Sequence, residues 1–279
     1  MSAERIARRL RTAGLSILGA GSIVFLFVPV LTVLAYSFNT SNFLVYWRGF
    51  GTRWFSAALS NPDILSALRV SIEVAFTATL ASLVVGTAAG YAMVRAPRWI
   101  SLALAAMLLG ALTIPEIVLA VGDVLWFAKI GLGSGIFAMI VGHSIFGSAL
   151  VGFVVRARMI NADRSLEEAA TDLGATSLVV MRTVLLPYLA PALASGALLA
   201  FTLSLDDVIV SEFVSSPLST PLPVYIFGST RAGIRGDIAA MAAIMFAVTL
   251  VGVGLALLVA RRFSGRRSTN LLLVTGQAG

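Results

Sequence analysis

The sequence predicts an all-α membrane protein with six transmembrane helices. Of its 279 residues, 58% are hydrophobic and only 12% are charged, and the mean hydropathy is +0.96. This apolar excess is larger than the core of one soluble domain of this length can bury, so lipid must solvate the remainder. The chain has no solenoid repeat, low-complexity tract or linker, and we therefore expect residues 1–279 to form a single transmembrane domain.

The expected spans are long runs with few charges. The first, residues 13–36, is uncharged over 24 residues, and at about 1.5 Å per residue it crosses a hydrocarbon layer roughly 30 Å thick. A cleavable signal peptide has a shorter apolar core of about 7–15 residues, so we expect this segment to be retained. The remaining runs are 65–94, 100–127, 136–155, 184–211 and 238–260. In the second run, Gly86 and Gly90 form a small-residue face suited to close helix packing.

The basic residues are divided unequally between the two sets of loops that these spans create. Fourteen of the 20 Lys and Arg residues fall on the side of the two termini, and six fall on the opposite side. The positive-inside rule then places both termini in the cytoplasm. The net charge of +7 does not indicate nucleic-acid binding, because the arginines lie beside apolar runs rather than among polar and aromatic residues.

Several kinds of chemistry are excluded by what the sequence lacks. There is no cysteine, which removes disulfides and thiolate metal sites, and a single histidine cannot form a metal cluster. No GxxxxGK[ST] phosphate-binding loop occurs, so we expect no ATP hydrolysis and no cofactor in this chain. The sequence therefore predicts a transport subunit and not an enzyme.

One expected cytoplasmic loop, residues 156–183, mixes both charge signs with apolar positions. Ser165 suits a helix N-cap, and Glu168 three residues later completes a capping box. Gly174 suits the position after the end of that helix, and a second helix follows. One face of the first helix is apolar: Leu166, Ala169, Ala170 and Leu173. Composition alone leaves two alternatives open. The loop could lie in the lipid interface, and Glu168 could serve only as a helix cap.

The spacing of residues in this loop adds a resemblance to a known family. The pattern consists of Glu168-Ala169-Ala170, Gly174, Val184 and Leu186-Pro187. It is similar to the EAA loop of bacterial ABC importer permeases of type I, which have a MetI-like fold. In that family the loop, here residues 156–187, carries a coupling helix that sits in a groove of the ATPase. The resemblance assigns Glu168, Ala169, Ala170 and Gly174 to the transmission of ATP-driven motion.

The same resemblance implies a set of partners and a location. The partners are an ABC ATPase homodimer that binds ATP and magnesium, a second similar permease and an external binding protein. The location is the bacterial inner membrane, crossed several times, with cytoplasmic termini.

A second group of residues resembles a narrower family. The run from Leu203 to Phe213 contains Asp206 and Asp207 and is similar to a segment of spermidine/putrescine permeases. Two other segments extend the resemblance: Pro115-Glu116-Ile117-Val118 and Tyr36-Ser37-Phe38-Asn39 with Trp47, Gly49 and Phe50. Polyamines are multivalent cations that need carboxylates for charge and aromatic faces for cation–π contact. The resemblance assigns Glu116, Asp206 and Asp207 to substrate contact, and Trp47 suits the aromatic role.

Other roles stay open for these residues. Asp206 and Asp207 also suit a helix end in an outer loop, Glu116 suits a pair with Lys129 or with the companion permease, and Trp47 suits an interfacial anchor. Three further polar groups lie in apolar runs: Glu73, Asp123 and His143. The two acids either pair within the bundle or face the pathway, and His143 is expected to be a hydrogen-bonded buried group rather than a proton relay.

The function also has alternatives. An ABC importer permease for another small solute, such as ferric iron or an opine, has a similar sequence pattern. A secondary transporter uses intramembrane acids as well, but it needs no coupling loop.

Overall fold

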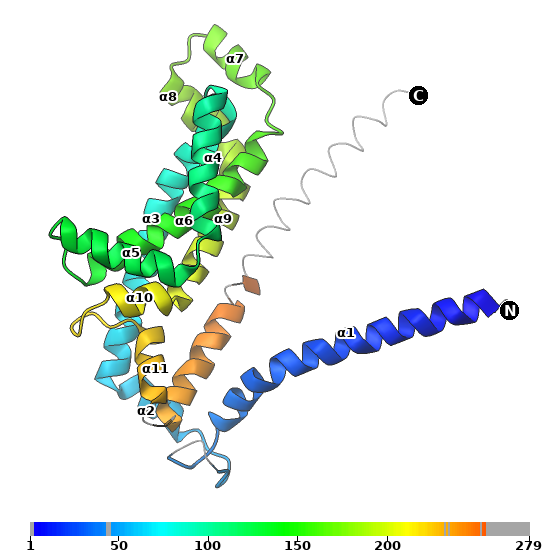
Figure 1. Ribbon diagram of the computed structural model, residues 1–279, viewed down its shortest axis with the longest axis vertical. Coiled ribbons are helices and arrows are strands. Elements are labelled where there is room, and N and C mark those ends of the chain that lie inside the picture. The colour runs from blue at the N-terminus through cyan, green and yellow to red at the C-terminus, as the bar shows by residue number, and fades with distance from the viewer. Residues whose placement is uncertain (1–2, 43–45, 232, 234, 252, 255–279) are drawn as a thin grey trace. The chain divides into compact units, whose positions relative to one another are not determined.

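A computed structural model describes residues 3–42, 46–231, 233, 235–251 and 253–254, with the side chains of these residues described at 16 and from 18 onward (Figure 1). Regular structure in these residues is helical, apart from isolated bridges such as that between Asn39 and Phe50. The first six helices are α1 (Ala3–Tyr36), α2 (Arg53–Ser60), α3 (Pro62–Arg95), α4 (Arg98–Thr113), α5 (Glu116–Lys129) and α6 (Ile136–Met159). The next five are α7 (Ser165–Asp172), α8 (Ser177–Val180), α9 (Leu186–Asp206), α10 (Ile209–Val214) and α11 (Leu222–Thr230). A further helix covers Gly236–Val251.

The all-helical membrane class is confirmed, whereas the number of six spans is not. Among the residues described, four helical segments are long and apolar enough to cross a membrane. They are Leu18–Tyr36, Pro62–Arg95, Ile136–Met159 and Ser177–Asp206. The sixth expected run, 238–260, corresponds to the shorter helix Gly236–Val251, and residues 252 and 255–260 lie outside the described residues.

The expected run 100–127 is not one straight helix. It is divided into α4 and α5, which meet at a bend of 108°. Pro115 explains the break, because proline lacks a backbone N–H and disfavours helical geometry at the residue before it. Ile114 accordingly adopts an extended conformation, with φ −65° and ψ 132°. If the bent pair is one broken span, the described residues contain five candidate spans.

The expected run 184–211 also differs from the structure at both ends. A π-helical turn, Met181–Leu185, precedes α9, close to Pro187, which cannot donate a backbone hydrogen bond. At the other end α9 stops at Asp206, Asp207 is extended with ψ 122°, and α10 begins two residues later. The helix is therefore interrupted where the sequence places its pair of acids.

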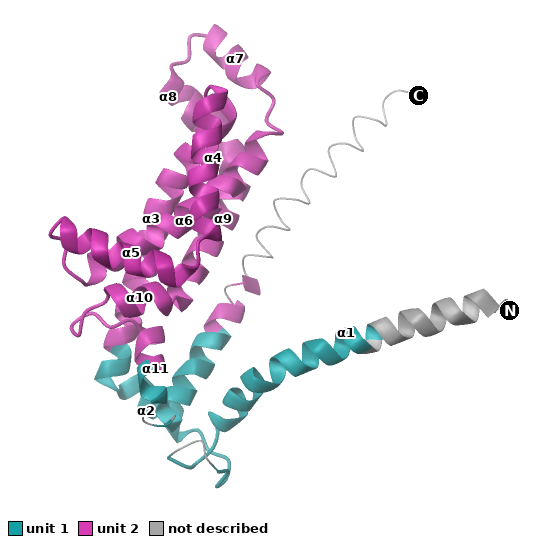
Figure 2. Ribbon diagram, viewed as in Figure 1, with its two compact units in different colours: residues 1–65, 228–247 teal, residues 66–227, 248–279 magenta. Residues whose placement is uncertain are grey.

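The chain consists of two compact units, which are described separately (Figure 2). Unit 1 comprises residues 1–65 and 228–247, and unit 2 comprises residues 66–227 and 248–279. In unit 1, none of the apolar window of α1 is buried within the chain, so lipid or another subunit must cover it.

The described residues after α1 in unit 1, 37–42 and 46–51, are arranged around Asn39. This side chain is fully buried. Its Nδ2 donates to the carbonyl oxygen of Tyr46 at 2.8 Å, and its Oδ1 accepts the backbone N–H groups of Ser41 at 3.1 Å and Arg48 at 3.0 Å. A single buried amide thus satisfies three backbone groups that a loop would otherwise leave unpaired.

Unit 2 has α7 at one end and α5 and α10 toward the other, with α4, α6 and α9 between them (Figure 2). The predicted glycine face on α3 is confirmed as a packing surface against α6. A Cβ on Gly90 would lie 2.6 Å from the carbonyl oxygen of Gly152 and 2.8 Å from the Cβ of Val155. Gly86 meets Val151 in the same way. These glycines let the two helices approach closely, so they need no chemical role.

We predict that Gly90→Ala destabilises the protein and that Gly110→Ala does not. The added methyl at position 90 overlaps backbone, at a cost of about 1–3 kcal/mol. At Gly110, in α4, no atom lies within 4 Å of an added Cβ, and alanine favours a helix by about 1 kcal/mol. Apparent melting temperatures of the two variants in detergent measure the difference. Equal melting temperatures would contradict the close α3–α6 contact.

Candidate functional site

A cavity of about 260 Å³ lies within unit 2 between α4, α5, α6, α9 and α10. Most of its lining is apolar, with side chains such as Leu119, Phe146 and Leu203. The polar side chains that reach it are Glu116, Asp123, His143, Ser204 and Asp207. No lysine or arginine is among the described residues of the lining. The cavity therefore combines apolar walls with three carboxyl groups.

Two of these acids lie where a helix is interrupted. Glu116 is the first residue of α5, directly after Pro115 and the bend. Asp207 follows the last residue of α9, and its Oδ1 accepts the backbone N–H of Ser211 at 2.8 Å. The carboxyl groups of Glu116 and Asp207 are neighbours. The predicted alternative of a Glu116–Lys129 pair is wrong, because these residues are at opposite ends of α5, about 20 Å apart along the axis.

His143 in α6 connects the cavity to both sides of the α9–α10 break. Its Nδ1 lies 2.6 Å from Ser204 Oγ, and its Nε2 lies 3.1 Å from Ser211 Oγ and 3.4 Å from Asp207 Oδ1. Hydroxyl groups both donate and accept, so they satisfy either tautomer of the ring. The prediction of a hydrogen-bonded buried histidine is confirmed. The structure adds a contact between its Nε2 and the carboxyl group of Asp207.

Asp123 and Glu73, whose roles the sequence leaves open, differ in position. Asp123 lines the cavity, and a Cβ on Gly142 would lie 3.1 Å from its Oδ2. Glycine at position 142 thus leaves room for the carboxyl group. Glu73 is an exposed residue of α3 and is not among the residues of the cavity lining.

The structure separates Asp206 from Asp207, although the sequence groups them. Asp206 is exposed and is not part of the cavity lining. Trp47 belongs to unit 1, where its ring meets that of Tyr36 edge to face with centroids 5.8 Å apart. Substrate contact by Asp206 and by Trp47 stays a prediction.

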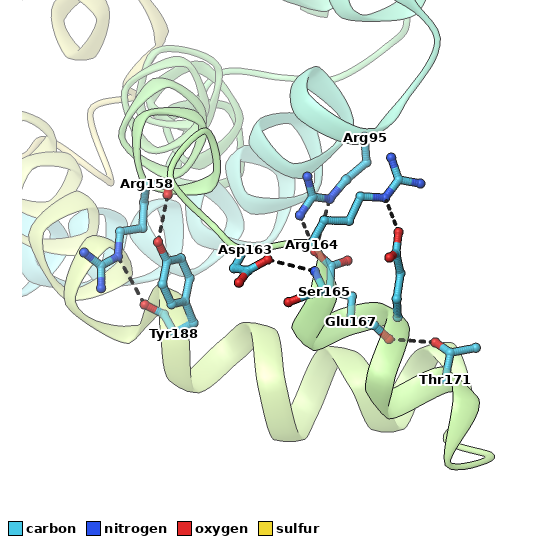
Figure 3. A network of polar contacts seen from close by, with 9 residues as sticks. Arg95, Arg158, Asp163, Arg164, Ser165, Glu167, Thr171 and Tyr188 are labelled. Carbon is cyan, nitrogen blue, oxygen red and sulfur yellow. Dashed lines mark hydrogen bonds and ion pairs between the residues drawn. The ribbon is translucent and has the colours of Figure 1, made fainter.

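The loop 156–183, which the sequence predicts to be cytoplasmic, forms the predicted helix, turn and helix, but the predicted capping box is wrong (Figure 3). The backbone N–H of Ser165 donates to Asp163 Oδ1 at 2.9 Å, so the charged side chain of Asp163 takes the role expected of Ser165. This bond holds the pKa of the Asp163 carboxyl group below its usual value. Glu168 pairs with Arg164 instead, at 3.1 Å.

The turn and the apolar face of α7 agree with the sequence. Gly174 has a φ of +83°, a left-handed conformation that favours glycine after a helix end. No side chain of α7 is buried, and Leu166 and Leu173 are 55% and 89% exposed. Ala169 and Glu168 are also exposed. This face of the helix is thus uncovered by the described part of the chain.

Two contacts at this end of unit 2 have no signal in the sequence. The guanidinium group of Arg158, near the end of α6, lies 4.4 Å from the ring centroid of Tyr188 (Figure 3). Arg158 Nε donates a hydrogen bond to the carbonyl oxygen of Tyr188, and the hydroxyl group of Tyr188 donates one to the carbonyl oxygen of Arg158. Arg95 of α3 forms an ion pair with Glu167 of α7. Both contacts join residues far apart in the chain, so periodicity and spacing do not reveal them. By contrast, Asp123 and His143 are polar groups in apolar runs, which is a sequence signal for a site.

Comparisons with known proteins agree with the family resemblance. Residues 82–265 match the family described as binding-protein-dependent transport system inner membrane component. The chain is 38% identical to the putrescine transport system permease protein PotI of Escherichia coli K12, over 82% of this chain and 84% of that protein. It is 34% identical to the spermidine/putrescine transport system permease protein PotC of the same strain, over 85% of this chain and 90% of that protein.

A solved structure supports the fold. A chain of a bacterial ABC transporter involved in the import of alginate superposes with a TM-score of 0.65 at 16% identity, over 94% of this chain and 98% of that chain. At this identity the likeness concerns the fold alone. On the extent of the family match and the identity to its relatives, this chain belongs to the family of binding-protein-dependent transport system inner membrane components.

Proposed function

We propose that this chain is the permease subunit of an ATP-driven importer of polyamines, putrescine or spermidine. The observation that carries the substrate class is the cavity with Glu116, Asp123 and Asp207 in its lining. Three carboxyl groups suit a multivalent cation, and the apolar walls suit the methylene chain between its ammonium groups. The names of the relatives agree with this substrate class. An anion importer would need basic side chains at the cavity.

Transport proceeds by alternating access in a complex with other subunits. A separate ABC ATPase homodimer binds ATP and magnesium, a second similar permease completes the pathway, and an external binding protein delivers the polyamine. The exposed face of α7, with Glu168, Ala169 and the turn at Gly174, is the surface that the ATPase engages, and Ala170 lies beside it. Closure of the ATPase moves α7 and thereby opens the cavity to one side of the membrane.

The proposed topology is a single domain in the bacterial inner membrane with six spans and cytoplasmic termini. In this topology α4 and α5 form one broken span, and the helix Gly236–Val251 begins the last one. The loop with α7 and α8 then faces the cytoplasm, because it lies on the side richer in arginine.

Polyamine uptake into proteoliposomes that contain the complete complex tests the proposal. We predict that Asp207→Asn raises the KM for polyamine about tenfold or more, because a hydrogen bond to a charged group is worth about 1.5–3 kcal/mol. Asp63→Asn is the matched control and should leave KM within about twofold, since Asp63 is an exposed residue of α3 outside the cavity lining. Equal effects of the two variants would contradict the cavity as the substrate site. Uptake without ATP would contradict an ABC importer.

A histidine variant tests how Asp207 is held. We predict that His143→Ala raises the KM for polyamine, because the carboxyl group of Asp207 and the hydroxyl groups of Ser204 and Ser211 lose their shared partner. His143→Asn keeps one donor and one acceptor and should restore part of the affinity. If the two variants transport equally well, His143 has no role in positioning Asp207.

Charge reversal on α7 tests the ATPase contact. We predict that Glu168→Lys leaves membrane insertion intact and weakens copurification of the ATPase, because it removes an acidic group from the exposed face. Asp63→Lys, in the first turn of α3, makes the same change of charge away from the loop and should have no effect. Normal copurification with normal uptake in Glu168→Lys would remove this residue from the ATPase contact.

A further inference from the structure

Few side chains attach α7 to the membrane helices. No residue of α7 is buried, so apolar packing does not fix it in place. In the part of the chain that the structure describes, its side chains form one ion pair with a membrane helix, between Glu167 and Arg95 of α3 (Figure 3). The other ion pair of the helix joins Glu168 to Arg164 and stays within the loop. The Arg95–Glu167 pair is therefore the described side-chain connection between α7 and α3.

The surroundings of this pair favour both charges. Arg95 is the last residue of α3, and Glu167 lies in the first turn of α7, so each charge complements the dipole of its own helix. Arg95 Nε donates to Glu167 Oε1 at 3.1 Å, and Nη2 donates to the same oxygen. The two side chains are 16% and 15% exposed, whereas those of Arg164 and Glu168 are 73% and 65% exposed. Because solvent and salt screen a sheltered pair less, Arg95–Glu167 is the stronger of the two connections.

The backbone links the loop that carries α7 directly to α6 and α9 but not to α3. The helices α6 and α9 are joined to the loop through the backbone, so any movement of α7 reaches them directly. The helix α3 has no such path, because Arg95 and Glu167 are 72 residues apart in the sequence. We infer that the Arg95–Glu167 pair transmits the movement of α7 to α3 during transport. This inference rests on the proposed role of α7 as the helix that engages the ATPase.

The two consecutive glutamates of α7 therefore have different roles. Glu167 faces inward and holds α3, whereas Glu168 is exposed and available to the ATPase. Arg95 and Glu167 are positioning residues, since neither lines the substrate cavity. Removal of either charge should leave ATP hydrolysis active but reduce the transport that it drives.

The test uses the complete complex in proteoliposomes, with polyamine uptake and ATP hydrolysis measured on the same sample. We expect Arg95→Gln and Glu167→Gln to lower the uptake per ATP hydrolysed about fivefold or more, the low end of typical coupling between sites. The charge exchange Arg95→Glu with Glu167→Arg re-forms the pair and should restore part of this ratio, although both charges then oppose the dipoles of their helices. Arg98→Gln is the matched control, because Arg98 is exposed and the described residues give it no ion pair.

A distance measurement gives a readout that does not depend on uptake. The chain has no cysteine, so cysteines introduced at Asp172 in α7 and Val85 in α3 carry the only spin labels of this subunit. We expect a narrow distance distribution in the unaltered protein and in Arg98→Gln, and a broad one in Arg95→Gln.

Three results would overturn the inference. The first is an unchanged ratio of uptake to hydrolysis in both single variants. The second is a loss that the charge exchange does not repair, because the two residues would then act separately. The third is a parallel fall of complex yield and uptake, which would make the pair a requirement for assembly. Failure of the proposed function is distinguishable, since the unaltered complex itself would then lack ATP-dependent polyamine uptake.

Discussion

The absence of water from the bilayer core is the constraint on which this structure depends. Every backbone N–H and C=O group there needs a partner within the protein, so the chain crosses as helices, and irregular backbone is tolerated only beside a cavity. The breaks at Pro115 and at Asp207 obey this rule, because both border the acid-lined cavity. Pro115 has no N–H to satisfy, and the carboxyl group of Asp207 accepts the N–H of Ser211. The two helix interruptions thus lie at the candidate site and place Glu116 and Asp207 in its lining.

The same breaks explain how acidic side chains are accommodated in an apolar protein. Glu116 begins α5 and Asp207 lies two residues before the start of α10, so both are near the positive ends of helix dipoles. His143 adds a polar contact to Asp207, and its ring is itself held by two hydroxyl groups. These interactions offset part of the cost of removing carboxyl groups from water. In the proposed function, a bound polyamine supplies positive charge to a cavity lining without lysine or arginine.

Composition revealed the helical membrane class, and the conformational need of glycine after a helix end revealed the turn at Gly174. The family came from the resemblance of the spaced residues around Glu168 and Gly174 to a known motif. The interruption at Pro115 was not predicted, because the apolar run 100–127 is long enough for one continuous span and contains a single proline. The sequence also grouped Asp206 with Asp207, since adjacent residues look equivalent until the direction of each side chain is known. Pairs such as Arg95–Glu167 depend on how helices pack, and one sequence carries no record of that packing.

The helices α6 and α9 connect the loop that carries α7 to the cavity as one antiparallel pair. Near the loop, Arg158 is bonded to Tyr188, and at the cavity His143 is bonded to Ser204. The intervals between these contacts, 15 residues in α6 and 16 in α9, both correspond to about 22–24 Å of helix.

Between the two contacts α6 and α9 pack closely against each other. A Cβ on Gly147 would lie 3.5 Å from that of Ala200, and one on Gly196 would lie 3.3 Å from Val151 Cγ2. Two helices joined at both ends and packed closely between them resist sliding past each other. In the proposed transport cycle, a displacement of the loop therefore reaches Asp207 as a movement of the pair as a whole, so that contact of the ATPase with the loop changes the shape of the cavity.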